Sequence, residues 1–545
     1  MRIRLISAAF FLAALAAPVS AQTADPVFAP EAVKAHVDFL ADDLLEGRET
    51  GTRGYDLAAR YVATRFEALG LVPGGPNGSW YQQVPFVEYR PDPAKPAFVT
   101  IGGKRFDGGV DVIVPATGVA GMQALTGGAV FVGHGLERDY GKLDVKGKFV
   151  VALLGTPQGL SKSAAAAAAA EDKVANARKH GALGLISLVS PGALKDGFPW
   201  GRYATAMTRA RTSWVDAQGN PAGEAPVQFY AKDSAATALF AGAANPAERL
   251  FAELAKGKRP LGFPLVPTVS VTRENSVTAM PSPNVVGILP GSDPRLSAEY
   301  VVLSAHLDHL GIRSGDAPGD KIYNGAMDNA AGVATMLEAA RAFVESGKRP
   351  RRSILFVALT GEEEGLLGSG YLAQHPVTGN GRVVADVNLD MPILLYDFTD
   401  VVAFGAEHST LGPIVEAAAA KMGVKLSPDP LPEENLFVRS DHYSFVKAGV
   451  PSVFLVTGFA NGGEAVFRDF LANHYHKVSD QPDLPFDWKA GAKFARINYL
   501  IAREIADGAE APRWYEGNLY GDRFAPGQPR AKKPAPMAGV PAVGG

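Results

Sequence analysis

The sequence predicts a mixed α/β fold, in which helices sandwich a largely parallel β-sheet and a β-rich domain is inserted into the chain. From Asn284 onward, apolar strand-like segments such as YVVLSAH, SILFVALTG and PSVFLVTG alternate with helical segments over short connections. Nearly continuous apolar strands of this kind are typical of a buried, largely parallel sheet covered on both faces. Before Asn284, glycine-bounded strands such as KGKFVVALLG separate this half from a helical N-terminal region, which indicates the insert.

The N-terminal region predicts two helices. Apolar residues recur at three- and four-residue spacing over residues 30–70, on both sides of the glycine-rich break GRETGTRG at 47–54. Thr50 or Thr52 is a candidate cap for the second helix. We expect five parts along the chain: a signal peptide (1–21), the N-terminal part of the main domain (22–119), the insert (120–282), the main α/β domain (283–512) and a C-terminal extension (513–545). The Pro/Ala/Gly-rich end of that extension, from about Arg523, is expected to be disordered.

The first residues read MRIRLISAAFFLAALAAPVSAQ, with two arginines, an apolar stretch and the small residues Val19-Ser20-Ala21. This pattern is typical of a cleavable secretory signal, and its apolar part is too short for a spanning helix. We therefore expect cleavage after Ala21, a secreted or periplasmic protein, and no membrane association after cleavage.

Composition excludes several classes of function. The 545 residues are 47% hydrophobic and 20% charged, with a formal net charge of −3, so the chain is globular and has no basic block that would attract nucleic acid. The chain contains no cysteine. A thiol nucleophile is therefore impossible, and any transition-metal site must use His, Asp and Glu.

Five segments place acidic residues or histidine beside apolar strands or a helix. His306 and Asp308 end YVVLSAHLD, the run Glu362–Glu364 ends SILFVALTGEEE, and Asp390 ends VVADVNLD. Asp328 precedes a helix expected over 329–343, and NHYHKVSD carries His474 and His476. Ligands in open α/β sheets bind at the carboxyl ends of strands. Taken singly, Asp328 is more readily explained as a helix cap than as a ligand, although its two oxygens allow both roles. The three glutamates could be a solvated charge run, but their place between a buried strand and the apolar Leu366-Leu367 favours a bound cation. Only one of the two histidines is expected to be a ligand. Asp308, two residues after His306, is expected to accept a hydrogen bond and orient a neighbouring ligand.

Together, these segments indicate a metal site. Nitrogen and oxygen ligands in this mixture suit Zn²⁺, with Mn²⁺ or Co²⁺ as possible substitutes. Three carboxylates and two histidines exceed what one tetrahedral catalytic zinc takes, because such a site keeps a position for water. Two ions sharing one carboxylate fit the count, and such a pair can hold a bridging hydroxide and polarise a carbonyl group.

At these residues the sequence resembles the secreted zinc aminopeptidase family that also includes glutamate carboxypeptidases. The matching motifs are SAHLDHLG, GAMDNAAG, EExGLLGS at Glu362–Ser369, NLDM and HYHKVSD, together with LADDLLEGRETGTRGYDLAARYV near the N-terminus. The resemblance implies that His306 and Asp390 bind one zinc ion, that Glu363 and His476 bind another, and that Asp328 bridges the two. It implies that Glu362 is the general base for attack by the bridging hydroxide on a peptide bond, and that Tyr475 can stabilise the oxyanion.

The insert resembles a protease-associated domain, in its segments VFVGHGLERDYGKLDVKGKFVVALLGTP and KVANARKHGALGLISLV. The resemblance implies a β-rich module beside or over the cleft. A gate or a filter of substrate length is a hypothesis for its role.

The expected function is therefore a secreted two-zinc exopeptidase that acts on peptide substrates, an aminopeptidase by preference. A carboxypeptidase acting on acidic dipeptides is the alternative within the family, for which Arg439 is a candidate carboxylate-binding residue. A single-zinc glutaminyl cyclase, a binding protein that has lost its metals, and a serine hydrolase using Ser369 are further alternatives. His309 and His442 are candidates for a supporting role beside the site.

Overall fold

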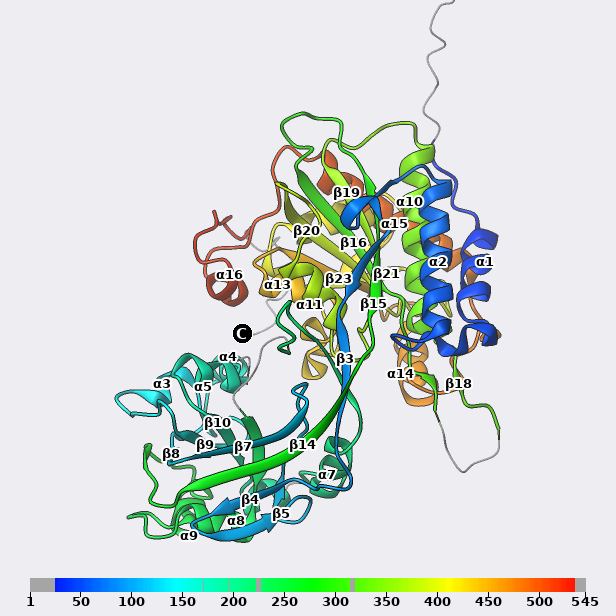
Figure 1. The fold of residues 1–545 in the computed structure, drawn as a ribbon. Helices are drawn as coiled ribbons and strands as arrows, with labels where there is room; N and C mark the ends of the chain where they lie inside the picture. The colour runs from blue at the N-terminus through cyan, green and yellow to red at the C-terminus, as the bar shows by residue number, and fades with distance from the viewer. Residues whose placement is uncertain (1–24, 170, 196, 222–226, 314–318, 535–545) are drawn as a thin grey trace, which may run out of the picture.

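The computed structural model describes residues 25–534, except 170, 196, 222–226 and 314–318. Figure 1 shows two regions joined by long strands: a helix-covered sheet in the upper part and a smaller, strand-rich region in the lower part. The predicted signal peptide, residues 1–21, lies outside the described residues. Within the described residues, no helix combines the length and the apolar character needed to cross a bilayer.

A nine-stranded sheet forms the centre of the upper region. Its four central strands are parallel to one another: β19 (Ser353–Leu359), β16 (Glu299–His306), β20 (Arg382–Leu389) and β23 (Ser452–Thr457). Antiparallel strands flank them: β15 (Ser282–Leu289) beside β19, and β21 (Asp400–Phe404) beside β23. The edges are completed by β1 (Val72–Pro73), β2 (Tyr81–Val84) and β22 (Lys425–Ser427). The predicted largely parallel sheet is confirmed.

Helices cover both faces of this sheet because its strands are buried and largely apolar. One face packs against α1 (Pro30–Leu40), α2 (Arg53–Ala68), α10 (Ala331–Glu345) and α15 (Trp488–Asp507), which bury a single large core. In Figure 1, α1, α2 and α10 stand side by side along the sheet. The other face is covered by α11 (Leu367–Gln374) and α13 (His442–Lys447), through Leu372 and Phe445. The two predicted N-terminal helices are present, and Thr52 caps the second by accepting from Tyr55 N.

The remaining helices lie at the edges of the main sheet. They are α12 (Leu411–Ala420), α14 (Gly463–Asn473) and α16 (Leu519–Phe524). Two short strands, β17 (Gly311–Ile312) and β18 (Ile322–Tyr323), pair with each other beside the N-terminal segment.

The lower region contains two six-stranded sheets. One is ordered β13 (Phe263–Pro264), β8 (Ala129–Phe131), β9 (Phe149–Leu153), β10 (Gly184–Leu188), β12 (Val227–Ala231) and β6 (Val112–Ile113). The other contains β11 (Arg211–Trp214), β3 (Phe86–Pro91), β14 (Val269–Ala279), β4 (Phe98–Ile101) and β5 (Lys104–Asp107), with β7 (Gly121–Gly127) also paired to β14. Its helices are α3 (Glu137–Tyr140), α4 (Lys162–Ala169), α5 (Lys173–Lys179), α6 (Pro191–Lys195), α7 (Trp200–Met207), α8 (Asp233–Leu239) and α9 (Ala247–Leu254).

The strand-rich region begins earlier than the predicted boundary at residue 120. Strands β3 to β6 pair within its two sheets, starting from Phe86. The sequence of this segment does not reveal the difference, because a strand pattern specifies alternation and not the sheet that the strand joins. The strand β11 contacts the main domain through Trp214, which packs edge-on against Tyr371 of α11 with ring centroids 5.2 Å apart.

The C-terminal extension is ordered further than its composition predicts. Trp514 is fully buried and donates from its indole nitrogen to Gly449 O at 3.0 Å, and Ala531 N donates to Trp514 O at 2.9 Å. These contacts tie the chain as far as Ala531 to the main domain, so disorder does not begin at Arg523. Residues 535–545 lie outside the described part of the chain.

Candidate metal centre

The five predicted metal ligands meet at the carboxyl end of the parallel strands. His306 is the last residue of β16, Asp390 directly follows β20, and Glu363 lies in the turn after β19. Asp328 comes from the segment that leads into α10, and His476 from the loop after α14. The carboxyl ends of parallel strands are the edge where α/β sheets bind ligands.

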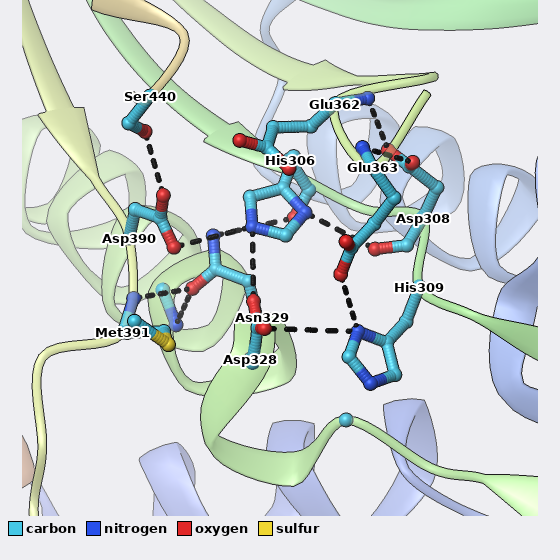
Figure 2. A network of polar contacts seen from close by, with 12 residues as sticks. His306, Asp308, His309, Asp328, Asn329, Glu362, Glu363, Asp390, Met391 and Ser440 are labelled. Atoms are coloured by element: carbon cyan, nitrogen blue, oxygen red, sulfur yellow. Dashed lines mark hydrogen bonds and ion pairs between the residues drawn. The ribbon is translucent and has the colours of Figure 1, made fainter. Parts of the chain in front are cut away.

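Two groups of ligand atoms can be distinguished within the cluster. In the first group, His306 Nε2 lies 3.2 Å from Asp328 Oδ1 and 3.2 Å from Asp390 Oδ1. Figure 2 shows these three side chains converging from separate elements. In the second group, His476 Nε2 lies 3.2 Å from Asp328 Oδ2 and 3.2 Å from Glu363 Oε2. Asp328 therefore presents one oxygen to each group.

The spacing of these atoms fits a pair of divalent ions. Tetrahedral zinc with bonds of about 2.0–2.1 Å places neighbouring ligand atoms roughly 3.3 Å apart. A direct charge-assisted hydrogen bond would be shorter, at about 2.7–2.9 Å. The four contacts of 3.2 Å match the first spacing better than the second. The donor set of imidazole and carboxylate suits zinc and its chemical neighbours.

A third histidine, His309, also faces this group. Its Nδ1 lies 2.7 Å from Glu363 Oε1 and 3.9 Å from Asp328 Oδ2, so proximity alone groups it with these two carboxylates as a possible ligand set. The 2.7 Å distance is that of a hydrogen bond, and we therefore assign His309 the role of orienting Glu363 (Figure 2). This is the supporting role for which the sequence made His309 a candidate.

Asp308 positions the turn that carries Glu362 and Glu363. Its buried carboxylate accepts the backbone N–H groups of both residues, each at 3.2 Å. Asp308 thus orients a ligand, as predicted, but it does so through the backbone and does not touch the reacting position. Glu362 itself lines the cavity above the ligand atoms. Burial raises the pKa of its carboxyl group well above the ordinary value.

Three residues that the sequence did not single out form hydrogen bonds that support the proposed ligands or the backbone beside them. Ser440 donates to Asp390 Oδ2 at 2.6 Å. The buried carboxylate of Asp480 accepts Met327 N at 2.8 Å and Asp328 N at 3.0 Å. Asn329 donates to Leu389 O at 2.9 Å and accepts Gly332 N at 3.0 Å, so it joins the end of β20 to the start of α10. The alternative reading of Asp328 as a helix cap is wrong, because α10 has Ala330 at its N-cap and Asn329 supplies the side-chain bond.

Arg48 is the buried cation beneath the site. Its guanidinium donates to Leu307 O at 2.8 Å and to Asn324 O at 2.6 Å, and it also bonds Leu40 O and Gly325 O. Burial lowers its pKa to about 10, while the carboxylates of Asp480, Asp308, Asp328 and Glu363 act in the opposite direction. Arg48 therefore stays charged at neutral pH, and it fixes both loops that lead to His309 and Asp328.

We expect Arg48→Met to weaken zinc binding about 10–100-fold, because a support of the ligand loops is lost. The matched control is Arg352→Met. Arg352 is also fully buried, but it binds Glu299 and the carbonyls of Ile505 and Gly508. Both variants are expected to lower the free energy of unfolding by about 2 kcal/mol or more. Chelator competition measures the zinc dissociation constant, and equal zinc affinity in the two variants would contradict this role of Arg48.

The loop after α14 separates its two histidines. His474 turns away and its Nδ1 contacts Ser479 Oγ at 3.0 Å, so His476 is the histidine that faces the carboxylates. The ring of Tyr475 stacks on His476 with centroids 3.8 Å apart, and Tyr475 lines the same cavity as Glu362. Burial and the nearby carboxylates raise the pKa of Tyr475, so its hydroxyl keeps its proton and can donate.

Three other candidate residues are placed away from the reacting position or are already paired. Ser369 is buried and donates to Ser444 Oγ at 2.9 Å, and no described histidine contacts it, as a serine nucleophile would require. His442 packs between Phe437 and Phe454, and burial lowers its pKa to about 3. Arg439 lies at the cavity wall, 3.6 Å from Glu434.

The fold and the site define an α/β protein with a two-part histidine–carboxylate centre. The model of peptidase family M28 matches residues 284–502 of this chain. Those residues contain both groups of ligand atoms.

Relatives with assigned names match parts of the chain. It is 41% identical over 108 residues to a "Probable zinc metalloprotease" of Pyrenophora teres f. teres (strain 0-1), which covers 20% of this chain and 22% of the relative. It is 26% identical over 333 residues to "Aminopeptidase NAALADL1" of Mus musculus, covering 52% and 41%. It is 30% identical over 179 residues to a "Probable leucine aminopeptidase" of Trichophyton verrucosum (strain HKI 0517), covering 32% and 46%. The chain thus spans less than half the length of these relatives.

The solved structure titled "Aminopeptidase from Aneurinibacillus sp. strain AM-1" aligns with 88% of this chain and 94% of its own, at a TM-score of 0.46 and 19% identity.

Proposed function

We propose that this protein is a zinc-dependent metallo-exopeptidase with two ions, and that it acts as an aminopeptidase. One observation carries the proposal: Asp328 presents one oxygen to each of two histidine–carboxylate groups, 3.2 Å from His306 Nε2 and 3.2 Å from His476 Nε2. Glu362 stands beside both groups in the same cavity. The match to peptidase family M28 supports the reaction class.

His306, Asp328 and Asp390 would hold one ion, and Asp328, Glu363 and His476 the other. When bound, the ions would polarise the scissile carbonyl and lower the pKa of the attacking water. Glu362 would take a proton from that water on its carboxylate and return it to the leaving amine. The protonated hydroxyl of Tyr475 would donate to the oxygen that gains charge. Asp308 keeps Glu362 and Glu363 in register through their backbone N–H groups.

The cavity favours an aminopeptidase over a carboxypeptidase for acidic dipeptides. The whole cavity has a volume of about 230 Å³. Away from the ligands it is lined by apolar side chains: Phe404, Phe454, Val456, Phe467 and Leu471. These would accept an apolar terminal side chain. Arg439, the candidate for binding an acidic group, faces Glu434, so its charge is already opposed. The relatives named as aminopeptidases support the same choice.

A panel of peptides tests this proposal. We expect peptides with a free amine and an N-terminal Leu or Phe to be hydrolysed, and N-acetylated forms of the same peptides to be resistant. Chelation is expected to abolish turnover, and zinc readdition to restore it. Faster cleavage of N-blocked peptides with an acidic C-terminus would establish the carboxypeptidase instead. Retention of a single ion per chain would favour the glutaminyl cyclase, and failure to bind any ion would favour the metal-free binding protein.

The export of the protein and the nature of the insert are proposals from the sequence. Secretion rests on residues 1–21, and sequencing the N-terminus of exported protein tests for cleavage after Ala21. If the insert is a protease-associated domain that filters substrates by length, its removal is expected to change the preference of the enzyme for peptides of different lengths. Such a deletion would have to span β3 to β14, because these two strands pair with each other.

A further inference from the structure

A chain of buried polar side chains runs behind the metal ligand Asp390. It starts at Ser440, continues through Asn388 and Ser304, and ends at Asp386. Asn388 and Asp386 lie on β20, and Ser304 lies on the neighbouring strand β16. All four are at most 1% exposed, so water cannot complete their hydrogen bonds.

The contacts along this chain are all of hydrogen-bond length. Ser440 Oγ lies 2.6 Å from Asp390 Oδ2, and Asn388 Nδ2 lies 2.7 Å from Ser440 Oγ. Ser304 Oγ lies 3.0 Å from Asn388 Oδ1 and 2.8 Å from Asp386 Oδ1. Figure 2 shows the first of these contacts, with Oδ1 of Asp390 left facing His306.

Counting protons along the chain fixes its direction. A metal ligand such as Asp390 is ionised and can only accept hydrogen bonds. The single hydroxyl proton of Ser440 must therefore be donated to Asp390. Ser440 then accepts from the amide of Asn388, whose oxygen must in turn accept from Ser304. The only hydroxyl proton of Ser304 is then donated to Asn388, yet Ser304 Oγ also lies at hydrogen-bond distance from Asp386 Oδ1. The fourth contact therefore needs a proton from Asp386.

Exchanging the oxygen and nitrogen of the Asn388 amide does not remove this requirement. Ser440 would then face two acceptors, Asp390 and the amide oxygen, with one proton. The surroundings of Asp386 favour its neutral form as well. Burial, together with the nearby buried carboxyl group of Asp441, raises the pKa of Asp386 well above its ordinary value. Among the described residues, no Lys, Arg or His forms an ion pair with Asp386.

We propose that Asp386 is a neutral carboxylic acid that donates its proton to Ser304, and that it thereby sets a one-way hydrogen-bond chain holding Oδ2 of Asp390 and leaving Oδ1 for the metal. Asp386 is a positioning residue, because it acts only through Ser304, Asn388 and Ser440. The inference rests on the proposed role of Asp390 as a metal ligand. An ionised Asp386 would claim the proton of Ser304 and leave the buried oxygen of Asn388 without a donor, which is costly in an interior that excludes water.

Infrared spectroscopy of the metal-free full-length protein tests the protonation state directly. The spectrum of Asp386→Asn is subtracted from that of the wild type at pH 8. We expect the difference to contain the C=O band of a protonated carboxylic acid, shifted in D₂O. Other buried acids, such as Asp441 and Glu362, are common to both proteins and cancel. A difference that contains only carboxylate bands overturns the proposal, whatever the protein does with metals.

Zinc affinity tests the positioning role. Asp386→Asn keeps a donor toward Ser304, so its zinc dissociation constant is expected to stay close to that of the wild type. Asp386→Leu and Ser304→Ala both break the chain, and each is expected to weaken zinc binding about tenfold or more. Equal losses in the Asn and Leu variants overturn the proposal. If the Leu variant does not fold, the comparison of Asp386→Asn with Ser304→Ala decides. Wild-type protein that binds no zinc would refute the proposed function, while the infrared result would still stand.

Discussion

Glu362→Gln is expected to lower kcat by about 10²–10⁴-fold while the zinc content stays at the wild-type level. The reason is that Glu362 and Glu363, in the turn after β19, have different proposed roles. Glu363 is a proposed ligand and lies 3.2 Å from His476, whereas Glu362 lines the cavity. An amide at position 362 fills the same volume but cannot take a proton from water. Metal analysis and steady-state kinetics on the same preparation separate loss of chemistry from loss of metal.

The neighbouring Glu364 offers a matched control. Its carboxyl group is largely buried and hydrogen-bonded to Thr212 of the insert, and it belongs to neither group of ligand atoms. Glu364→Gln can keep that contact, so kcat is expected to remain within about threefold of the wild type, the range of a substitution outside the chemistry. If the Glu364 variant lost turnover while a metal-replete Glu362 variant kept it, the assignment of the base would be wrong.

Asp328→Ala is expected to abolish the binding of both zinc ions. Asp328 is the only one of the five proposed ligands that contacts both groups, with Oδ1 toward His306 and Oδ2 toward His476. Its removal takes one ligand from each ion and exposes the two ions to direct repulsion. Turnover is expected to fall below detection for the same reason.

The stoichiometry of bound zinc in three variants makes this prediction specific. Asp390→Ala and His476→Ala each remove a ligand from one group only, so each is expected to retain about one ion per chain. Asp328→Ala is expected to retain none. Asp397→Ala, which removes an exposed carboxylate paired with Lys493, controls for loss of charge and is expected to retain two. A protein that keeps two ions without Asp328 would show that this carboxylate does not bridge them.

Much of the main sheet could be predicted from the sequence because each central strand is largely apolar and either ends in a polar residue or is followed directly by one. His306 and Asp390 follow from that pattern alone, since a polar side chain at the end of a buried strand faces the edge where ligands bind. The choice of Glu363 within the run Glu362–Glu364 did not follow from the pattern. It needed the resemblance, and the structure places that residue against His476 and His309.

The supporting roles of Arg48 and Asp480 could not be predicted because these side chains act over long separations, through backbone atoms. Arg48 binds carbonyl groups more than 250 positions away, and nothing in its local pattern indicates this. Asp480 was visible only as the end of the motif HYHKVSD, and its contact with Asp328 N spans 152 positions. The start of the insert at Phe86 was missed for a related reason: strand pairing between β3 and β14 is a long-range choice.

The contacts of Arg48 also constrain the order in which the molecule can fold. Three of the four carbonyl groups that accept hydrogen bonds from its side chain belong to residues synthesised long after it, 259 positions later for Leu307. Closing so long a loop carries an entropic cost that grows with the length of flexible chain between its ends. Pairing of β3 with β14 brings Phe86–Pro91 beside Val269–Ala279, so early folding of the insert would leave only short connections to be closed. A lesion inside the insert would then slow maturation of the metal centre without touching any of its atoms.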